Sequence, residues 1–399
     1  MQYGYAERMQ RVKPNAIRTL LRYGKDPELI SFGGGWPYPE IFPHEELCVV
    51  YDKLLKDQYA DALQYTVSEG LPALREKIAE RMRKVGVDCG LENIFMISGG
   101  QQGLDIAAKC FVNEGDVIVT EAPTFLGGLI AFNPMMPCYK GVAMDEDGMI
   151  MEDLEQVLKT TERVKMIYVI PDFQNPTGVS LSLERRKHMV ELANRYKVII
   201  LEDNPYREVR FGLAPLPSIK SFDTEGRVIH LGCFSKILCP GMRLGWVVAS
   251  KELAEKLCLL KMAGDTQCST LNMYAVDQYL EMYDIDKQIA KICKIYSQKK
   301  DLMMEALRKN FGETSTFTNP KGGLFTWLSL PRDVDSAKFM EWALPKGKVA
   351  YVPGATFFPE KPEHNHCRIN YSCLSDEKIT EGIDRLGTLF QEYRQAIRV

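Results

Sequence analysis

Four polar side chains follow short apolar stretches in the middle of the chain, each within a few residues of the point where a stretch ends. They are an amide, a carboxylate, a phenol and an amine: Asn175, Asp203, Tyr206 and Lys236. An amine can form an imine with an aldehyde, and a carboxylate can keep a pyridine nitrogen protonated, so that the ring withdraws electrons. An amide and a phenol can hydrogen-bond a ring oxygen. The set therefore fits an aldehyde-bearing pyridine cofactor.

A glycine turn in the same part of the chain could bind a phosphate. Gly99 and Gly100 separate the apolar run Ile94–Ser98 from Gly103–Phe111, which is typical of a helix. Free backbone N–H groups and the dipole at the start of a helix attract an anion. Arg243, further along the chain, could add a bidentate contact. An ordinary strand-to-helix turn is the alternative interpretation, and the two are compatible, because such a turn is itself an anion site.

The elements that must position these residues are short apolar strands that alternate with amphipathic helices. Such strands indicate a mostly parallel sheet covered on both faces. Ligands bind outside the carboxyl ends of the strands in these sheets, where the polar residues lie. The fold class is therefore α/β. The expected strands are Ile94–Ser98, Asp116–Thr120, Val164–Ile170, Val198–Leu201 and Val228–Leu231, and the expected helices include Gly103–Phe111 and Leu183–Tyr196.

The pattern changes at the start of a long, charged helical stretch, Ile285–Asn310. An alternating strand at Gly322–Leu328, a short strand at Arg368–Tyr371 and a terminal helix from Asp376 follow it. We therefore expect three regions. An N-terminal arm (1–44) packs with the small domain, a large cofactor-binding domain spans 45–285, and a small α+β domain spans 286–399.

Composition and charge exclude several classes of partner. Fifty basic and fifty-three acidic residues give a net charge of −3 without a basic stripe, so we expect no nucleic-acid partner. No apolar run reaches the ~18 residues of a membrane span, so we expect no membrane partner. There is no secretory signal, and eleven scattered cysteines are typical of reduced thiols in the cytoplasm. No cysteine or histidine spacing suits a metal ion, so we expect none.

Several of these segments together resemble a known family. The segment from Cys233 to Trp246, CFSKILCPGMRLGW, is similar to the lysine signature of class I and II aminotransferases, which are fold type I enzymes that depend on pyridoxal 5'-phosphate (PLP). Asn175-Pro176-Thr177-Gly178 and Asp203-Asn204-Pro205-Tyr206 resemble two further motifs of that family. Ile30–Pro37 and Leu63-Gln64-Tyr65 resemble its 2-aminoadipate and kynurenine aminotransferase branch. The resemblance covers nearly the whole chain.

The resemblance implies a role for each matching residue around PLP. Lys236 forms the imine with the cofactor and moves the proton between the substrate and the cofactor. Asp203 pairs with the pyridine nitrogen, while Asn175 and Tyr206 hold the ring oxygen. Phe125 stacks on the ring. The phosphate is bound by Gly100, Gln101, Ser235 and Arg243, and by Tyr65 from a second subunit, so the resemblance implies a homodimer.

The resemblance also implies how substrates bind. Arg368 grips the α-carboxylate beside Asn175, and Gly35 touches the substrate. Arg18 would face a distal carboxylate, which suits 2-aminoadipate and glutamate. The candidate donors are these two and aromatic amino acids, with a 2-oxo acid as acceptor. Cys233 departs from the family pattern, because many relatives have a serine there, and a thiol donates a hydrogen bond more weakly than a hydroxyl.

Other interpretations stay open at this stage. Within the fold, a PLP-dependent lyase or decarboxylase is the alternative enzyme, because the cofactor supports several reactions and the pocket selects one. A transcription regulator with an aminotransferase-like domain would need a DNA-binding module ahead of the N-terminal glycine loop, Gly33-Gly34-Gly35, and only 30 residues precede Ser31. Taken singly, each of these residues also has an ordinary structural interpretation. Lys236 could lie in a loop and Asp203 could stabilise a turn. Phe125 and Tyr65 could be core residues, and Arg368 and Arg18 surface residues.

Overall fold

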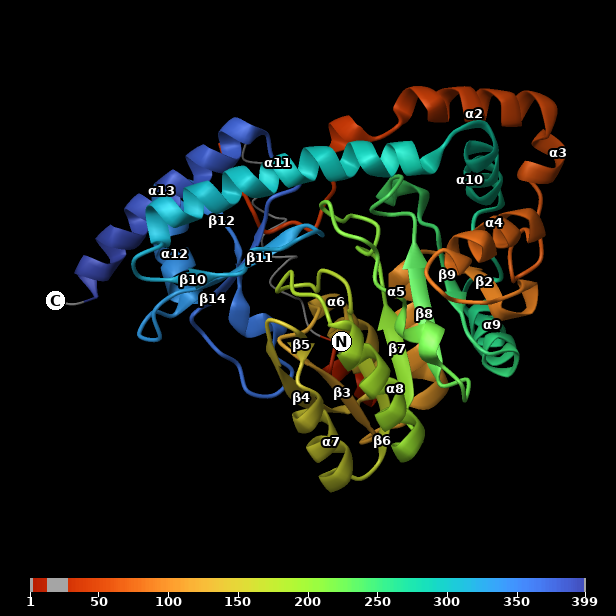
Figure 1. Ribbon diagram of the computed structural model, residues 1–399, viewed down its shortest axis with the longest axis horizontal. Helices are drawn as coiled ribbons and strands as arrows, with labels where there is room; N and C mark the ends of the chain where they lie inside the picture. Colours follow the sequence, from red (N-terminus) through yellow and green to blue (C-terminus); the bar gives the residue numbers. More distant parts are fainter. Residues whose placement is uncertain (1–2, 13–27, 398–399) are drawn as a thin grey trace.

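A computed structural model describes residues 3–12 and 28–397 of the chain. Its largest feature is an eight-stranded sheet with the order β2-β9-β8-β7-β6-β3-β4-β5 (Figure 1). The central strands β8, β7, β6, β3 and β4 are parallel neighbours. The predicted α/β class is thus confirmed. The strands are β2 (Ile94–Ile97), β3 (Val117–Ala122), β4 (Cys138–Asp145), β5 (Gly148–Met149), β6 (Val164–Val169), β7 (Ile199–Asp203), β8 (Val228–Cys233) and β9 (Gly245–Val248).

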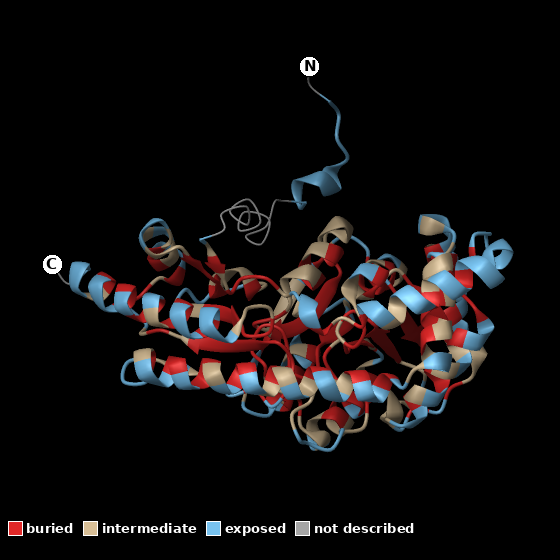
Figure 2. Ribbon diagram, turned by 90° about the horizontal axis from the view of Figure 1, so that it is seen from above, coloured by how far each residue is buried: buried red, intermediate tan, exposed pale blue. Residues whose placement is uncertain are grey.

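Both faces of the central strands of this sheet are buried, as uniformly apolar strands require. Along β6, Met166 and Tyr168 pack in one core cluster with α5 (Gly100–Phe111) and α9 (Lys251–Asp265). Ile167 and Val169, on the other face, pack with α7 (Met151–Thr160) and α8 (Leu183–Tyr196). The alternation follows from the period of two in a strand. Seen from above, buried strands lie between helices whose outer faces are exposed (Figure 2).

A third cluster covers the β2–β9 end of the sheet. It joins these strands to α2 (His44–Asp57), α4 (Pro72–Arg83) and α10 (Thr270–Met282). The short helices α3 (Tyr59–Ala62) and α6 (Leu126–Phe132) contact α10 and α5 respectively. The 3-10 turns are η1 (Glu7–Gln10), η2 (Pro39–Ile41), η3 (Leu91–Asn93), η4 (Asn133–Met135), η5 (Ile219–Phe222), η6 (Pro240–Met242) and η7 (Gly354–Phe357).

The last third of the chain builds a smaller α+β unit beside the large sheet. Its antiparallel sheet has the order β10-β11-β14-β13, and α11 runs from the large sheet to this unit (Figure 1). Ile30 and Phe32 belong to its core, and β1 pairs in parallel with β12. The elements are β1 (Ile30–Ser31), β10 (Thr316–Phe317), β11 (Phe325–Ser329), β12 (Val349–Ala350), β13 (Val352–Pro353), β14 (His366–Asn370), α11 (Ile285–Phe311), α12 (Ser336–Gly347) and α13 (Asp376–Ala396).

Two further findings concern the chain as a whole. Every one of the eleven cysteines is a free thiol. Among the helices in the described part of the chain, none combines the length and apolar character needed to cross a membrane.

Candidate active site

The carboxyl ends of four strands meet at one edge of the large sheet. Strands β6, β7 and β8 are parallel, so the residues that follow them share this edge. Strand β2 joins them although it pairs antiparallel with β9, because β9 is itself antiparallel to β8. Two reversals leave β2 pointing the same way as β8. The glycine turn after β2 therefore lies at the same edge as the predicted polar residues: the Cβ of an alanine at position 100 would stand 3.8 Å from Oδ1 of Asp203.

Lys236 lies just after β8 with its amine facing the glycine loop. Its Nζ donates a hydrogen bond of 2.8 Å to the carbonyl oxygen of Gly35. The pKa of this amine is lowered to about 8, mainly by burial; the positive charges of Arg243 and Arg368 act in the same direction, while Cys233 opposes them. A lysine with a depressed pKa is a stronger nucleophile near neutral pH, because more of it is unprotonated.

Gly99, Gly100 and Arg243 form a cradle for an anion. Helix α5 begins at Gly100, and no side chain caps its first turn. Gly99 has φ +84°, a conformation that favours glycine. A Cβ at Gly99 would lie 2.6 Å from Nη2 of Arg243, which donates to the carbonyl of Ser98. Because Gly99 has no side chain, the start of α5 and the guanidinium of Arg243 come close together. Backbone N–H groups beside a positive charge suit a phosphate.

Asp203, the last residue of β7, is buried, and among the described residues it has a single side-chain donor. The hydroxyl of Tyr168 donates to its Oδ2 at 2.9 Å. Burial raises the pKa of Asp203 to about 6, and the bond from Tyr168 acts in the opposite direction. A buried carboxylate with so few partners is stabilised by a cation or a protonated nitrogen beside it.

Arg368, on β14, brings the small unit to the site. It is 1% exposed and donates from Nη1 to Oδ1 of Asn175 at 3.0 Å and from Nη2 to the carbonyl of Gly33 at 2.6 Å. Its guanidinium stacks over Phe325. Burial lowers the pKa of Arg368 to about 10. Within the described residues its Nε has no hydrogen-bond partner and no carboxylate contributes to its pKa shift, so its charge is available to an anionic ligand.

The remaining predicted residues have different surroundings. Asn175 donates to the hydroxyl of Tyr206 at 3.3 Å. The ring of Phe125 folds over Gly127, so a Cβ there would lie 2.3 Å from Cζ. The side chain of Gln101 is exposed and donates to the carbonyl of Gly127, which leaves its backbone N–H for a ligand. Tyr65 is 81% exposed. Arg18 lies outside the described residues.

Ser235 and Cys233 lie together beside the amine of Lys236. The N–H and hydroxyl of Ser235 interact with the Cys233 thiol, and burial raises the pKa of that thiol. Both side chains are buried.

The structure adds residues that the sequence did not single out. Tyr168 holds Asp203, and Glu121 lies in the same buried group. The carboxyl of Glu121 accepts from the backbone of Ile170 and from Gln174 Nε2, both at 3.2 Å. Burial raises the pKa of Glu121 to about 8. A tyrosine in the apolar second half of β6 and a glutamate near the end of β3 were the available signals, since buried polar residues require partners.

These features fit PLP. The uncapped start of α5 with Arg243 suits its phosphate, Asp203 its pyridine nitrogen and Lys236 its aldehyde. Within the described residues, no group of three or more histidine, cysteine or acidic side chains is arranged to hold a metal. The fold and this site together define a PLP-binding enzyme.

Comparison with known proteins agrees. The model of the family "Aminotransferase class I and II" matches residues 46–386. Aromatic-amino-acid aminotransferase 1 of Thermococcus litoralis is 40% identical over 393 residues, which cover 97% of this chain and 94% of the relative. The 2-aminoadipate transaminase of Thermus thermophilus is 36% identical over 380 residues, which cover 94% of each protein. The crystal structure of Pyrococcus horikoshii kynurenine aminotransferase has a TM-score of 0.93 and 37% identity, with 98% of this chain and 97% of that chain covered.

The chain therefore belongs to the class I and II aminotransferases. It is a PLP-dependent aminotransferase of fold type I, and its resemblance to the 2-aminoadipate and kynurenine branch is confirmed.

Proposed function

We propose that Lys236 carries the cofactor and that Arg368 binds the α-carboxylate of both the amino donor and the 2-oxo acid acceptor. When bound, PLP supplies an aldehyde carbon that accepts the amino group and a ring that withdraws electrons from the substrate Cα. The observation that carries the proposal is the facing pair itself. The amine of Lys236 and the unpaired guanidinium of Arg368 both contact the glycine loop, through Gly35 and Gly33.

Lys236 would move the proton. A pKa of about 8 leaves an appreciable fraction of the amine neutral near pH 7, so it could accept a proton from the substrate Cα and would pass it to the cofactor. The carbonyl of Gly35 holds the amine in place in the meantime. Gly35 therefore positions the base as well as lying against the substrate.

Arg368 would orient the substrate. A guanidinium and a carboxylate form a planar two-pronged pair, which fixes both distance and direction. Asn175 links this pair to the cofactor, because it accepts from Arg368 and donates to Tyr206. The α-carboxylate and the ring oxygen would thus be aligned through one amide.

The other residues would hold the cofactor. Asp203 would bind the pyridine nitrogen, and Tyr206 with Asn175 the ring oxygen. Phe125 would stack on the ring. The phosphate would lie at the start of α5, bound by Gly100, Gln101, Ser235 and Arg243, with Cys233 nearby.

For the donor we propose 2-aminoadipate, glutamate and aromatic amino acids. Two relatives of similar identity support both kinds of substrate, since one is named for aromatic amino acids and the other for 2-aminoadipate. A basic group at the far end would favour the acidic donors. Arg18 is our candidate for that group.

We propose that the working unit is a homodimer in the cytoplasm. Large exposed apolar side chains support the dimer, because they lie in two chain segments. A hydrogen bond from the N–H of Thr66 to the side chain of Gln267 joins these segments. Tyr65 lies among them and would reach the phosphate of the partner's site. We call this set the α3–α9 surface. Its members are Tyr59, Leu63, Tyr65 and Val67 in the first segment and Leu259 and Met262 in the second, each 49–81% exposed.

We also propose that the unit boundaries follow the predicted ranges 1–44, 45–285 and 286–399. The packing of Ile30 and Phe32 in the small unit supports the arm. Ile292 and Tyr296 of α11 pack with the large sheet, so the first turns of the small unit's longest helix would hold the two units together.

Covalent mapping tests the role of Lys236. Borohydride reduction of the holoenzyme, followed by peptide analysis, should place the reduced cofactor on Lys236. A reduced adduct on another lysine would contradict the proposal.

A donor panel tests the role of Arg368. With 2-aminoadipate, glutamate and phenylalanine as donors, Arg368→Lys should reduce kcat/KM for all of them alike, by roughly a hundredfold, since it removes the two-pronged contact to a group that they share. A loss confined to one donor would mean that Arg368 recognises the side chain instead.

A further inference from the structure

A second pocket lies outside the cofactor site, between α4, the segment that follows β7 and the first turns of α11. It encloses about 530 Å³, a size that suits a small organic ligand. We call it the α4–α11 pocket. Of the residues that we place at the cofactor site, only Cys233, which we propose to lie near the phosphate, is among the described residues that line it. Asn204 and Ile237 do line it, and they are the chain neighbours of Asp203 and Lys236, so the pocket adjoins the cofactor site from outside.

Three residues that line this pocket carry buried polar atoms with no hydrogen-bond partner among the described residues. They are Oδ1 of Asn204, Nε and Nη1 of Arg207 and Nε1 of Trp246. These three side chains are at most 6% exposed. An unmade hydrogen bond at a buried polar atom is costly, so a ligand that supplied partners here would be stabilised. Three of the four atoms are nitrogen donors, which calls for a ligand rich in acceptors.

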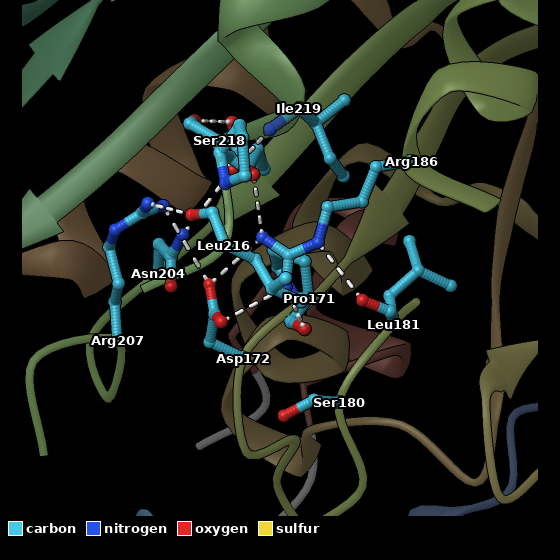
Figure 3. Close-up of polar contacts among 12 residues, drawn as sticks. Pro171, Asp172, Ser180, Leu181, Arg186, Asn204, Arg207, Leu216, Ser218 and Ile219 are labelled. Carbon is cyan, nitrogen blue, oxygen red and sulfur yellow. Dashed lines mark hydrogen bonds and ion pairs between the residues drawn. The ribbon is translucent and has the colours of Figure 1, made fainter. Parts of the chain in front are cut away.

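The charge around Arg207 points to an anion. Asp172 is fully buried and accepts from Arg186 and Arg210 at 2.9 Å. Nη1 of Arg207 stays 3.8 Å from the same carboxylate, too far for a hydrogen bond. Figure 3 shows Arg186 and Arg207 on opposite sides of Asp172, with Asn204 beside Arg207. Three guanidinium groups share one carboxylate, so Arg207 keeps a buried positive charge without a hydrogen-bonded carboxylate.

The neighbouring carboxylate does not fill this gap. Glu202 accepts from the hydroxyl of Ser218 and from the backbone of Ile219 and Lys220. It also lies 3.1 Å from Nδ1 of His230. Its oxygens are thus already occupied. An anion that reached Arg207 would have to enter from the pocket.

The rest of the wall selects the body of the ligand. Met82, Val85, Pro205, Leu213, Ile237 and Ile289 make most of it apolar. Two carboxylates, Glu208 and Asp286, also line it, paired with Arg81 and Lys84. Acidic groups of this kind disfavour a multiply charged anion such as phosphate. We propose that the α4–α11 pocket binds a small monocarboxylate with an aromatic or branched aliphatic body, whose carboxylate contacts Arg207 and Trp246.

The test must separate this pocket from the substrate site, which also binds carboxylates. We would use 4-(trifluoromethyl)phenylacetate as the probe, observe it by fluorine NMR, and work with the holoenzyme of the Arg368→Gln variant, which lacks the substrate's carboxylate contact. The neutral amide of the probe reports on the charge. In that background, Ala290→Trp should fill the pocket from the exposed face of α11. Lys291→Trp places the same ring on the neighbouring exposed residue, which does not line the pocket.

The proposal predicts that the probe binds the Arg368→Gln holoenzyme at one site per chain. Ala290→Trp should weaken this binding at least about tenfold, and Lys291→Trp should leave it unchanged. Arg207→Lys, which keeps the charge but removes Nε and the fork, should also weaken it, with the fold checked by circular dichroism. Absence of binding, binding insensitive to Ala290→Trp, or equal binding of the amide would overturn the proposal. Failure of this test leaves the assignment of Lys236 and Arg368 intact.

Discussion

Lys236 and Asp203 carry opposite charges, yet burial shifts both toward their neutral forms. The pKa of the amine falls to about 8 and that of the carboxyl rises to about 6. Each pKa shift means that the charged form of the group is destabilised in the protein without cofactor, because it is buried without an oppositely charged partner. A cofactor that offers a protonated ring nitrogen to Asp203 and an aldehyde to Lys236 relieves both. The site is thus arranged for a ligand.

The pKa of Lys236 predicts how the apoenzyme captures PLP. Only the neutral amine attacks the aldehyde, and a lowered pKa means that this form grows as the pH rises through about 8. The rate of capture, followed by stopped-flow absorption, should therefore rise between about pH 7 and about pH 9 and then level off. Arg368→Gln removes a positive charge that lowers this pKa, so its profile should move to higher pH. A rate independent of pH would contradict the assignment.

Tyr168 is predicted to position Asp203 and to keep it charged. The bond from its hydroxyl favours the carboxylate, so Tyr168→Phe should raise the pKa of Asp203 above about 6. Cofactor affinity should then fall roughly tenfold near neutral pH, the scale of one hydrogen bond to a charged group, and recover as the pH rises. Equilibrium dialysis of PLP across a pH series measures it.

Tyr139→Phe is the matched control for Tyr168→Phe. The hydroxyl of Tyr139 also makes hydrogen bonds, partly buried, to Asn133 and to the carbonyl of Leu129, neither of which we place at the cofactor site. This variant should leave the pH profile of PLP affinity in place. If Tyr168→Phe lowered the affinity equally at every pH, Tyr168 would have only a structural role.

At the scale of elements, we propose that the start of α5 determines where the phosphate lies. Gly99 combines φ +84° with an approach to Arg243 that a Cβ would block at 2.6 Å. Gly99→Ala should therefore displace the guanidinium as well as strain the backbone by roughly 1–3 kcal/mol. We expect a large loss of PLP affinity in a titration of the apoenzyme, together with a lower Tm.

Gly212→Ala separates the two effects of that substitution. Gly212 has φ +71°, and nothing lies within 4 Å of the position its Cβ would take. Gly212→Ala should therefore lower the Tm, as Gly99→Ala does, but leave the PLP affinity unchanged. An equal loss of affinity in both variants would show that the strain, and not Arg243, explains the result.

Some elements are predictable from the sequence and others are not, for physical reasons. Strands such as β6 and helices such as α8 follow from uniform apolar runs and from amphipathic spacing, and α8 begins and ends where predicted. Strand β9 is not predicted from the sequence, because Gly245 and Trp246 belong to the lysine motif. The strand reverses the sheet direction and brings β2 to the site. Strand β4 is half-exposed, so it lacks the uniform apolar run.

The residues of the site divide in the same way. Lys236, Asp203, Asn175 and Arg243 stand in local motifs, so their position in the chain indicates their chemistry. The contact between Arg368 and Gly33 joins residues more than three hundred positions apart, and no local pattern encodes it. Tyr168 is likewise recognisable only once β6 and β7 are seen to be neighbours.

At the scale of the whole molecule, the glycine loop ties the parts of the chain together at the site. It follows β1, which pairs with the small unit, and its carbonyls accept from Lys236 of the large unit and Arg368 of the small unit. A carboxylate that competes with Gly33 for Arg368 would change the contact between loop and small unit. Substrate binding and the relative position of the two units are therefore expected to be coupled.

The exposed α3–α9 surface extends this argument to a second chain. Apolar side chains so exposed in a single chain favour association, and Tyr65 among them would complete the partner's phosphate site. The native protein should therefore have twice the mass of the 45.4 kDa chain in analytical ultracentrifugation. Leu63→Lys combined with Leu259→Lys should give monomers that bind PLP more weakly. Tyr65→Phe should remain dimeric and lose about 1 kcal/mol of PLP binding, the scale of one hydrogen bond.

Ile397→Lys is the control for that experiment, because it changes an exposed apolar residue at the far end of the chain and should remain a dimer with full affinity. Dimers that persist in the double variant would mean that another surface joins the chains. Monomers with undiminished PLP affinity would mean that one chain holds the complete site. We expect the double variant to lose both the dimer and PLP affinity, and Tyr65→Phe to keep the dimer but lose PLP affinity. This pair of results is expected only if the partner's tyrosine contributes to the phosphate site.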